Sequence, residues 1–383
     1  MRLSFTTALL AVWVAVYVAA GLHTELELAA LKPIPASLMQ DFDFYRDALH
    51  AVADGNDPYA NRDIGTGFLY PPPALLLVAV FEPFNDLWRA SLFTTLNLAL
   101  LALMLVGVSR RFDLPLSRVW WWFPLAFAFA PTLELLHIGQ INLLVTFGVL
   151  IMFLFACRSP SLAGLGLGAA ICLKVTPIAF FVYLAVTKRF RVLAVSLITV
   201  AVLVGGFGVI YSFQPALDYV DVFRNLAQIS LPGGDGNAQS LPAILNYHGV
   251  IASGTEDEVQ KVLDGALLAA ILAAVGVAIA RTRSDGLFVV IGLSLVPASN
   301  IAWYHHYTFL LLPLCVWMAS MKLHPLAVAW VLGGLTLIQF DRFGLTHGLL
   351  AQVFILATIP LVLLAELRPA AGSNRRAVQR NDV

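Results

Sequence analysis

Residues 192–212, VLAVSLITVAVLVGGFGVIYS, carry no charged side chain and decide the class of fold. A helix crosses the hydrocarbon core of a bilayer with about 20 apolar residues, and this stretch is long enough. The chain is 60% apolar and only 12% charged, which excludes an ordinary soluble protein. Further apolar runs lie at residues 3–22, 88–107, 119–136, 141–157, 262–280, 286–304, 306–320, 324–340 and 346–366. We therefore predict an all-α polytopic integral membrane protein with about 12 transmembrane helices.

The first apolar run, residues 3–22, lacks a small-residue cleavage site before a polar region, so we expect an uncleaved span rather than a signal peptide. The three cysteines, Cys157, Cys172 and Cys315, all fall inside apolar runs. Neither a disulfide framework nor a metal cluster is indicated, and we expect no metal and no cofactor. The net charge is zero, and we expect no nucleic-acid partner.

Two ambiguous segments decide how the chain crosses the membrane. Residues 71–83 are short for a crossing, and residues 162–186 form either one helix or two short ones broken around Lys174 and Pro177. If 162–186 is broken and 71–83 is re-entrant, most of the 23 basic residues share the cytoplasm with Arg2, as the positive-inside rule requires. We favour this arrangement. The rival one, with 71–83 crossing and 162–186 unbroken, moves four arginines outside: Arg110, Arg111, Arg118 and Arg158.

Both arrangements put the two termini in the cytoplasm and two long polar segments outside, residues 23–70 and 213–261. Such loops can cap a substrate cavity. We expect residues 1–368 to form a single transmembrane domain and residues 369–383 to form a polar cytoplasmic tail.

The first outer segment contains the stretch Asp41-Phe-Asp-Phe-Tyr45, which plants carboxylates on a predicted amphipathic helix at the outer membrane face. Apolar side chains recur there at helical spacing: Leu38, Phe42, Tyr45, Leu49 and Val52. The opposite face is polar: Asp43, Asp47, His50 and Asp54. Asp41 lies four residues before Tyr45 on the edge of the apolar stripe, where desolvation would raise its pKa. Catalysis as a base and capping of the helix both remain open for Asp41.

Two motifs in the next part of the chain combine rigid backbone with polar side chains. The prolines of Tyr70-Pro-Pro-Pro73 fix an extended entry into an apolar segment, which suits either a binding site or a rigid turn. Between two apolar runs, three polar side chains can either bind sugar hydroxyls or satisfy helix ends: His137, Gln140 and Asn142.

Two later motifs place cationic groups in or near the membrane. Lys174 is costly there unless it meets a partner, and a lipid phosphate, an internal ion pair or snorkelling would each serve. The motif Trp303-Tyr-His-His-Tyr307 lies on the predicted outer side. Adjacent helical residues point about 100° apart, so the two histidines would not ligate one metal together. A histidine beside a carboxylate can support a base or, when protonated, contact a phosphate, although simple packing is also open.

In chain order, six motifs resemble those of the family-87 glycosyltransferases of the GT-C superfamily: Asp41-x-x-x-Tyr45, Gly55-Asn-Asp-Pro-Tyr59, Tyr70-Pro-Pro, Gly139-Gln-x-Asn142, Lys174-x-x-Pro177 and Trp303-x-His-His306. The resemblance covers about residues 3 to 320. It departs from the family at Ser299-Asn-Ile-Ala-Trp303, where Ser-Pro-Ile-Ser-Trp is frequent, which affects the local helix break and acceptor contacts.

The resemblance implies a GT-C fold in the bacterial plasma membrane. It also implies transfer of a hexose, expected to be mannose, from a polyprenyl-phosphate sugar to a lipid or glycan acceptor on the extracytoplasmic side, with inversion. Asp41 would be the base, supported by His305 or His306. The expected substrate-binding residues are Tyr45, Tyr70, His137, Gln140, Asn142, Lys174 and Trp303. Two alternatives remain open: an O-antigen ligase or polymerase, and a lipid or sugar transporter, which would more often show paired halves with matching broken helices.

Overall fold

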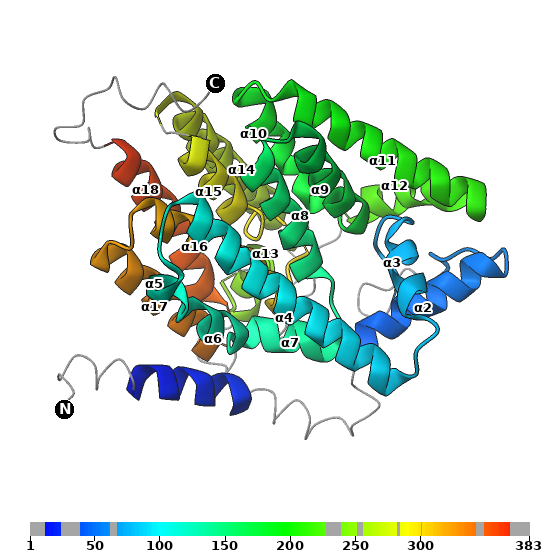
Figure 1. Cartoon of the computed structure of the whole chain (residues 1–383), viewed down its shortest axis with the longest axis horizontal. Helices are drawn as coiled ribbons and strands as arrows, with labels where there is room; N and C mark the ends of the chain where they lie inside the picture. Colours follow the sequence, from blue (N-terminus) through cyan, green and yellow to red (C-terminus); the bar gives the residue numbers. More distant parts are fainter. Residues whose placement is uncertain are drawn as a thin grey trace.

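The computed structural model describes residues 12–23, 39–61, 67–226, 239–250, 256–281, 284–299, 301–341 and 348–367. Over these ranges every regular element is a helix and there is no strand, which confirms the all-α prediction (Figure 1). Leu38, part of the loop 213–261 and the tail 369–383 fall outside these ranges.

An apolar helix, Val12–His23, precedes the labelled elements. These are α2 (Gln40–Ala53), α3 (Ala74–Phe81), α4 (Asp86–Arg111), α5 (Leu116–Val119), α6 (Trp122–Phe127), α7 (Ala130–Ile138), α8 (Asn142–Phe155), α9 (Pro160–Leu173), the 3₁₀ helix η1 (Thr176–Ala179), α10 (Phe180–Val186), α11 (Phe190–Ile210), α12 (Gln214–Leu226), α13 (Leu241–Tyr247), α14 (Glu256–Arg281), α15 (Ser284–Ser294), the 3₁₀ helix η2 (Tyr304–Leu310), α16 (Leu311–Ser320), α17 (Pro325–Phe340) and α18 (Leu349–Leu367).

Among the residues that the structure describes, two helices, α4 and α11, are each long and apolar enough to cross a membrane. The pair α7 and α8 also passes this test together, but its two parts are bent by 115°. Several other helices are apolar and shorter. The membrane character is therefore supported, while the number of crossings stays a prediction.

The apolar runs are more broken than hydropathy alone suggests. Residues 162–186 divide into α9, η1 and α10, and Lys174 lies at the break in extended backbone, with φ −155° and ψ 131°. Pro177 occupies the first turn of η1, where its missing N–H costs nothing. In the run 286–304, α15 ends at Ser294 and the 3₁₀ helix η2 begins at Tyr304. These breaks expose polar backbone, which membrane proteins tolerate where it lines a cavity or is covered by protein.

The centre of the bundle depends on small residues. Helix α9 packs between α8 and α11 (Figure 1), and a Cβ at Gly148 of α8 would lie 2.5 Å from the carbonyl oxygen of Gly166 in α9. Such close backbone approach is how membrane helices gain packing energy without a hydrophobic driving force.

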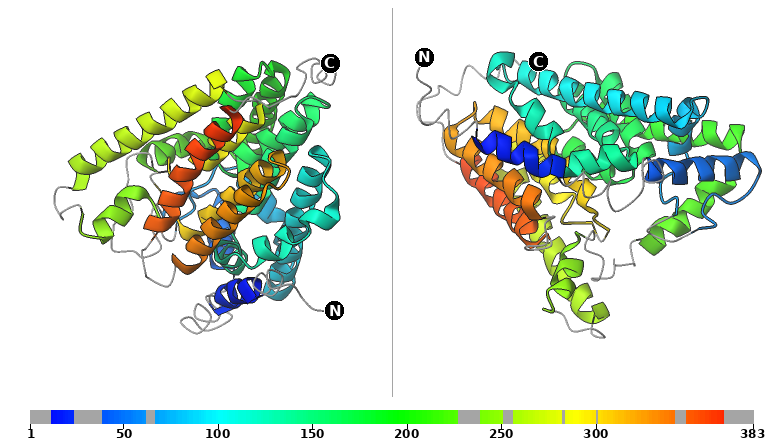
Figure 2. Two further views of the ribbon diagram at one scale, coloured as in Figure 1. Left: turned by 90° about the vertical axis from the view of Figure 1, so that its left-hand side faces the viewer. Right: turned by 90° about the horizontal axis from the view of Figure 1, so that it is seen from below.

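The helix Val12–His23 lies against α17 (Figure 2). The indole of Trp13 donates a hydrogen bond of 3.1 Å to Thr336, and the Gln339 side chain donates to the backbone carbonyl of Tyr17. The same Gln339 accepts from the backbone N–H of Ala130 at the start of α7. One buried amide thus ties the first helix to the α6–α7 junction.

Candidate active site

The bend between α7 and α8 brings α2 onto the bundle. Gly139 ends α7 with φ 80°, which favours glycine, and a Cβ there would lie 2.9 Å from Phe42. The backbone N–H of Met39 donates to the carbonyl of His137 at 2.7 Å. The segment from His137 to Asn142 therefore forms the surface on which the start of α2 packs.

The amphipathic reading of α2 agrees with its burial. Phe42, Tyr45, Leu49 and Val52 are buried, whereas the polar face formed by Asp43, Asp47, His50 and Asp54 is exposed. Asp41 is half-buried at the edge between the two faces. This is the position that helical spacing predicts.

Asp41 sits in a network of uncharged donors. The side-chain amide of Gln140 donates to its carboxylate, and the hydroxyls of Tyr45 and Tyr70 each donate to the Gln140 carbonyl oxygen at 3.1 Å. Burial raises the pKa of Asp41, while the neighbouring His305 and the Gln140 hydrogen bond lower it. A carboxylate with a raised pKa is suited to accept a proton.

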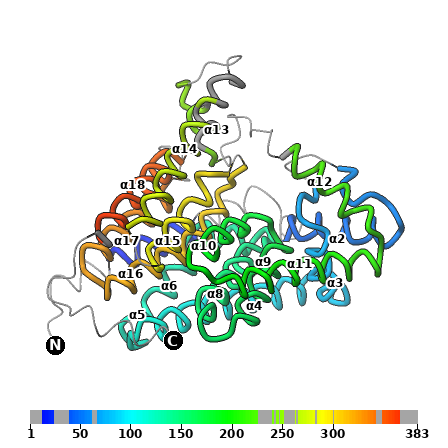
Figure 3. The backbone as a smooth tube through the Cα atoms, turned by 90° about the horizontal axis from the view of Figure 1, so that it is seen from above, coloured from blue at the N-terminus to red at the C-terminus, as the bar shows by residue number. Residues whose placement is uncertain are grey.

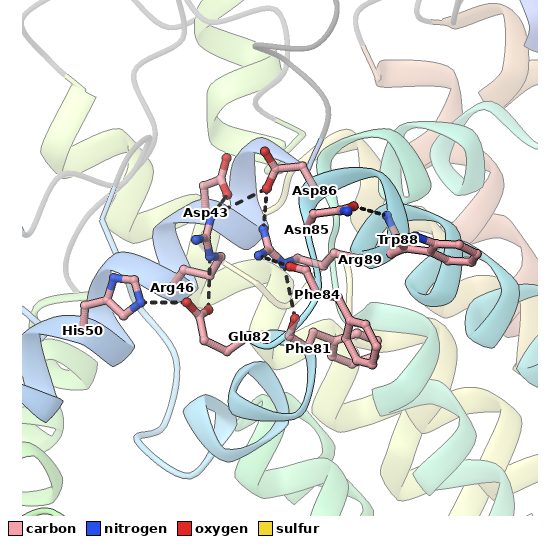
Figure 4. Close-up of polar contacts among 10 residues, drawn as sticks. All are labelled: Asp43, Arg46, His50, Phe81, Glu82, Phe84, Asn85, Asp86, Trp88 and Arg89. Carbon is pink, nitrogen blue, oxygen red and sulfur yellow. Dashed lines mark hydrogen bonds and ion pairs between the residues drawn. The ribbon is translucent and has the colours of Figure 1, made fainter.

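The polar face of α2 is held by ion pairs instead (Figure 4). Arg46 contacts Glu82 at 3.2 Å and Asp43 at 3.2 Å, and His50 contacts the other oxygen of Glu82 at 2.9 Å. In the first turn of α4, the guanidinium of Arg89 is buried and donates to Asp86 and to the carbonyl of Phe84. These contacts fix α2 to the α3–α4 corner.

Lys174 lies at the break after α9, next to the same network. Its ammonium donates to the Asn142 side chain at 3.1 Å, contacts His306 Nε2 at 2.8 Å, and lies 5.4 Å from the ring centroids of Tyr70 and Phe309. Across the described ranges, no carboxylate forms an ion pair with it. Tyr70 thus touches both the Asp41 network and Lys174.

The two adjacent histidines occupy different places, with ring planes 89° apart. His306 accepts the backbone N–H of Trp303 on Nδ1 and faces Lys174 with Nε2. His305 is buried, and its backbone carbonyl accepts from Asn142 and Thr308. The His305 ring lies close enough to Asp41 to lower the pKa of that carboxyl group.

Glu134 of α7 is a member of this cluster that the sequence analysis does not single out. The residue is only 3% exposed, and its Oε1 lies 3.8 Å from His305 Nδ1. One signal could have found it: a lone carboxylate inside the apolar run 119–136 is expensive and usually functional.

The remaining predicted residues contribute backbone and packing contacts around the site. The backbone carbonyl of His137 accepts a hydrogen bond from Met39 at the start of α2, and Trp303 packs beside Ala243 of α13. In the motif that ends at Tyr59, the tyrosine is fully buried and its hydroxyl donates to the carbonyl of Tyr70 at 2.9 Å. That motif therefore anchors the segment that carries Tyr70.

Over the part of the chain that the structure describes, no group of three or more His, Cys, Asp or Glu side chains is placed to hold a metal ion. The arrangement offers a half-buried carboxylate, two histidines and an ammonium around one bend. Such a set can accept a proton on one side and stabilise an anion on the other.

Comparison with known proteins identifies the family of this chain. Residues 68–298 match the model of glycosyltransferase family 87. Over 308 residues, the chain is 27% identical to a polyprenol-phosphate-mannose-dependent alpha-(1-2)-phosphatidylinositol mannoside mannosyltransferase of Mycobacterium tuberculosis, an alignment that covers 71% of this chain and 68% of the relative. The match confirms the resemblance seen in the motifs. Because it spans more than half of the sequence, this chain is a glycosyltransferase and belongs to family 87.

Proposed function

We propose that the protein transfers a single hexose, expected to be mannose, from a polyprenyl-phosphate sugar to a lipid or glycan acceptor, with inversion at the anomeric carbon. The relative's dependence on polyprenol-phosphate-mannose supports the donor class. The observation that carries the proposal is the pairing of a partly buried base, Asp41, with a separate ammonium, Lys174, around one bend. A one-step displacement needs these two opposite charges on opposite sides of the reacting carbon.

The base side acts on the acceptor. Its hydroxyl oxygen forms the new bond to the anomeric carbon while its O–H bond breaks, and the proton passes to the Asp41 carboxylate. Gln140 holds this carboxylate, and the hydroxyls of Tyr45 and Tyr70 in turn hold Gln140. Fixing the base in this way lowers the entropic part of the barrier.

The cationic side acts on the leaving group. The bond from the anomeric carbon to the phosphate oxygen breaks, and the phosphate takes the electron pair. Because His306 Nδ1 accepts a backbone N–H, the neutral ring carries its proton on Nε2, which faces the Lys174 ammonium. Two donors that face one another are poorly satisfied, and an anionic oxygen beside them would accept from both.

We place the site on the extracytoplasmic side of the plasma membrane. Arg111, at the end of α4, contacts Asp285 of α15 at 3.6 Å, and the Lys322 ammonium donates to the carbonyl of Phe112 at 2.5 Å. These contacts bring the basic ends of α4 and α16 together, as the favoured arrangement requires and the rival does not. The α2 corner lies at the other end of α4 (Figure 1), which the positive-inside rule then assigns to the outside.

Thiol labelling in intact cells tests this sidedness. The native Cys157, after α8, is exposed at the basic end, while Cys172 and Cys315 are buried. An impermeant maleimide is expected to miss Cys157 in intact cells and to reach it after permeabilisation. An Asp57→Cys variant, exposed after α2, should react without permeabilisation. The reverse pattern would place the site in the cytoplasm.

The activity itself is tested with purified protein, a radiolabelled polyprenyl-phosphate mannose and a membrane lipid extract. The expected product is one lipid or glycan enlarged by one labelled hexose, absent with Asp41→Asn. Direct transfer from a nucleotide sugar would overturn the donor class. Transfer of a preassembled glycan would identify a ligase, and movement of the donor between leaflets without transfer would identify a transporter.

A further inference from the structure

The inference concerns Glu134, and it rests on the proposed function. Glu134 is 3% exposed and His305 is 4% exposed, so both ionisable side chains are buried side by side in a bundle where isolated charges are costly. Their closest atoms, Glu134 Oε1 and His305 Nδ1, are 3.8 Å apart. This is an ion-pair distance that is too long for a hydrogen bond, and catalytic contacts of this kind often tighten when substrate binds.

The contact with Glu134 is the polar contact that the described structure gives the His305 ring. Its backbone carbonyl is held by Asn142 at 3.3 Å and Thr308 at 2.8 Å, but neither ring nitrogen has a hydrogen-bond partner within the described ranges. A buried polar ring with free nitrogens calls for an explanation. His306 differs, because its Nδ1 accepts the backbone N–H of Trp303 and its Nε2 lies 2.8 Å from the Lys174 ammonium.

We propose that Glu134 is a positioning residue that orients His305 through Nδ1 and directs its Nε2 toward Asp41 and the acceptor hydroxyl. A carboxylate on Nδ1 fixes the tautomer that leaves Nε2 without a proton. The proton that Asp41 takes from the acceptor can then pass to Nε2. Glu134 stabilises the resulting imidazolium, and the proton leaves with solvent after product release. Of the two adjacent histidines, His305 thereby supports the base and His306 the leaving phosphate.

A double-mutant cycle tests this assignment. Glu134→Gln keeps the size of the side chain and removes its charge, and it is expected to lower kcat by about 10- to 10²-fold while the donor KM stays within about twofold. His305→Gln should lower kcat at least as much. If Glu134 acts through His305, the double variant is no slower than His305→Gln alone.

A matched control separates this role from a general disturbance of α7. Thr132 lies on the same helix and is also fully buried. Thr132→Val should leave kcat within about threefold, and any loss should multiply with that of His305→Gln. Multiplying losses for Glu134→Gln and His305→Gln would overturn the proposal, and so would a rise in donor KM without a fall in kcat.

A variant that does not fold would hide the answer, so size-exclusion profiles and melting temperatures are compared first. If Glu134→Gln is unfolded, Glu134→Asp keeps the charge and withdraws it by one methylene. Its kcat loss should again vanish in the His305→Gln background, and persistence of that loss would reject the role. If wild-type protein transfers no sugar from polyprenyl-phosphate mannose, the proposed function itself is wrong. That outcome differs from failure of the Glu134 role, which requires an active wild-type enzyme.

Discussion

The charged side chains of the candidate site and those on the polar face of α2 differ in their partners. Arg46 forms ion pairs of 3.2 Å with Asp43 and Glu82, and His50 contacts Glu82 at 2.9 Å. Asp41 instead receives a neutral amide, and the described partners of Lys174 are an amide, an imidazole and two aromatic rings. A charged side chain whose partners are neutral can still bind or react with a substrate. A charged side chain in an ion pair is already neutralised and stabilises the fold.

The largest expected effect comes from Asp41→Asn, which removes the base without changing its size. We expect kcat to fall by about 10²- to 10⁴-fold, the range for general-base catalysis. Asp43→Asn, two residues away on the paired face, should keep at least about half of the activity. Transfer assays at saturating donor measure both. Equal losses in two folded variants would remove the distinction between the two faces.

The same variant also tests the cost of the unpaired carboxylate. Burial raises the pKa of Asp41 above its unfolded value, so the folded state binds the proton more tightly and loses stability as pH rises between the two values. At a pH where the carboxylate is ionised in both the folded and the unfolded state, Asp41→Asn should therefore melt at the same or a higher temperature than wild type. A lower Tm would indicate that Asp41 serves structure, as a capping residue does.

Lys174→Met is expected to be next in size. Loss of one electrostatic donor to a developing charge costs about 10²-fold, and here it should appear in kcat/KM for the donor, with the acceptor KM little changed. Lys174→Arg keeps the charge and should retain more activity than the methionine variant. An unchanged donor kcat/KM would leave Lys174 as a structural residue and move the phosphate role to the histidines or a helix terminus.

Gln140→Leu tests the neutral partner of Asp41. The Gln140 amide lowers the pKa of Asp41, so its removal should raise that pKa and move the acidic limb of the kcat/KM profile to higher pH. The loss should be largest in acid and shrink as pH rises. A uniform loss at every pH would mean that Gln140 only shapes the site.

Much of the base side of this site could be predicted from sequence because it depends on helical periodicity. The 100° step per residue put Asp41 on the buried edge of α2 and Asp43 on the exposed face, and the structure agrees. The cost of a lysine in an apolar run similarly marked Lys174, and the nearby proline marked the break that carries it. These are local properties of single segments.

The parts that sequence could not supply depend on contacts between distant segments. His305 and His306 are equivalent in the motif, and only the approach of Glu134 from α7 and Lys174 from the α9 break distinguishes them. The run 119–136 looks like one span, yet it divides into α6 and α7, which presents Glu134 to η2. Hydropathy cannot reveal such breaks, because a short apolar helix and half of a long one have the same composition.

The smallest effect is expected on the paired face of α2, from Glu82→Gln. This change weakens the contacts of Glu82 with Arg46 and His50 (Figure 4), at side chains that are 32%, 26% and 52% exposed. Partly exposed ion pairs contribute about 0.2–1 kcal/mol, so the free energy of unfolding should fall by no more than about 1 kcal/mol. The other contacts of α2, through Met39 and the buried Phe42, remain and keep Asp41 in place.

We therefore expect kcat within about threefold of wild type and a Tm lower by a few degrees. A loss as large as that of Asp41→Asn, with Tm unchanged, would show that the paired face takes part in the reaction and that the contrast between paired and unpaired charges does not separate structure from chemistry here.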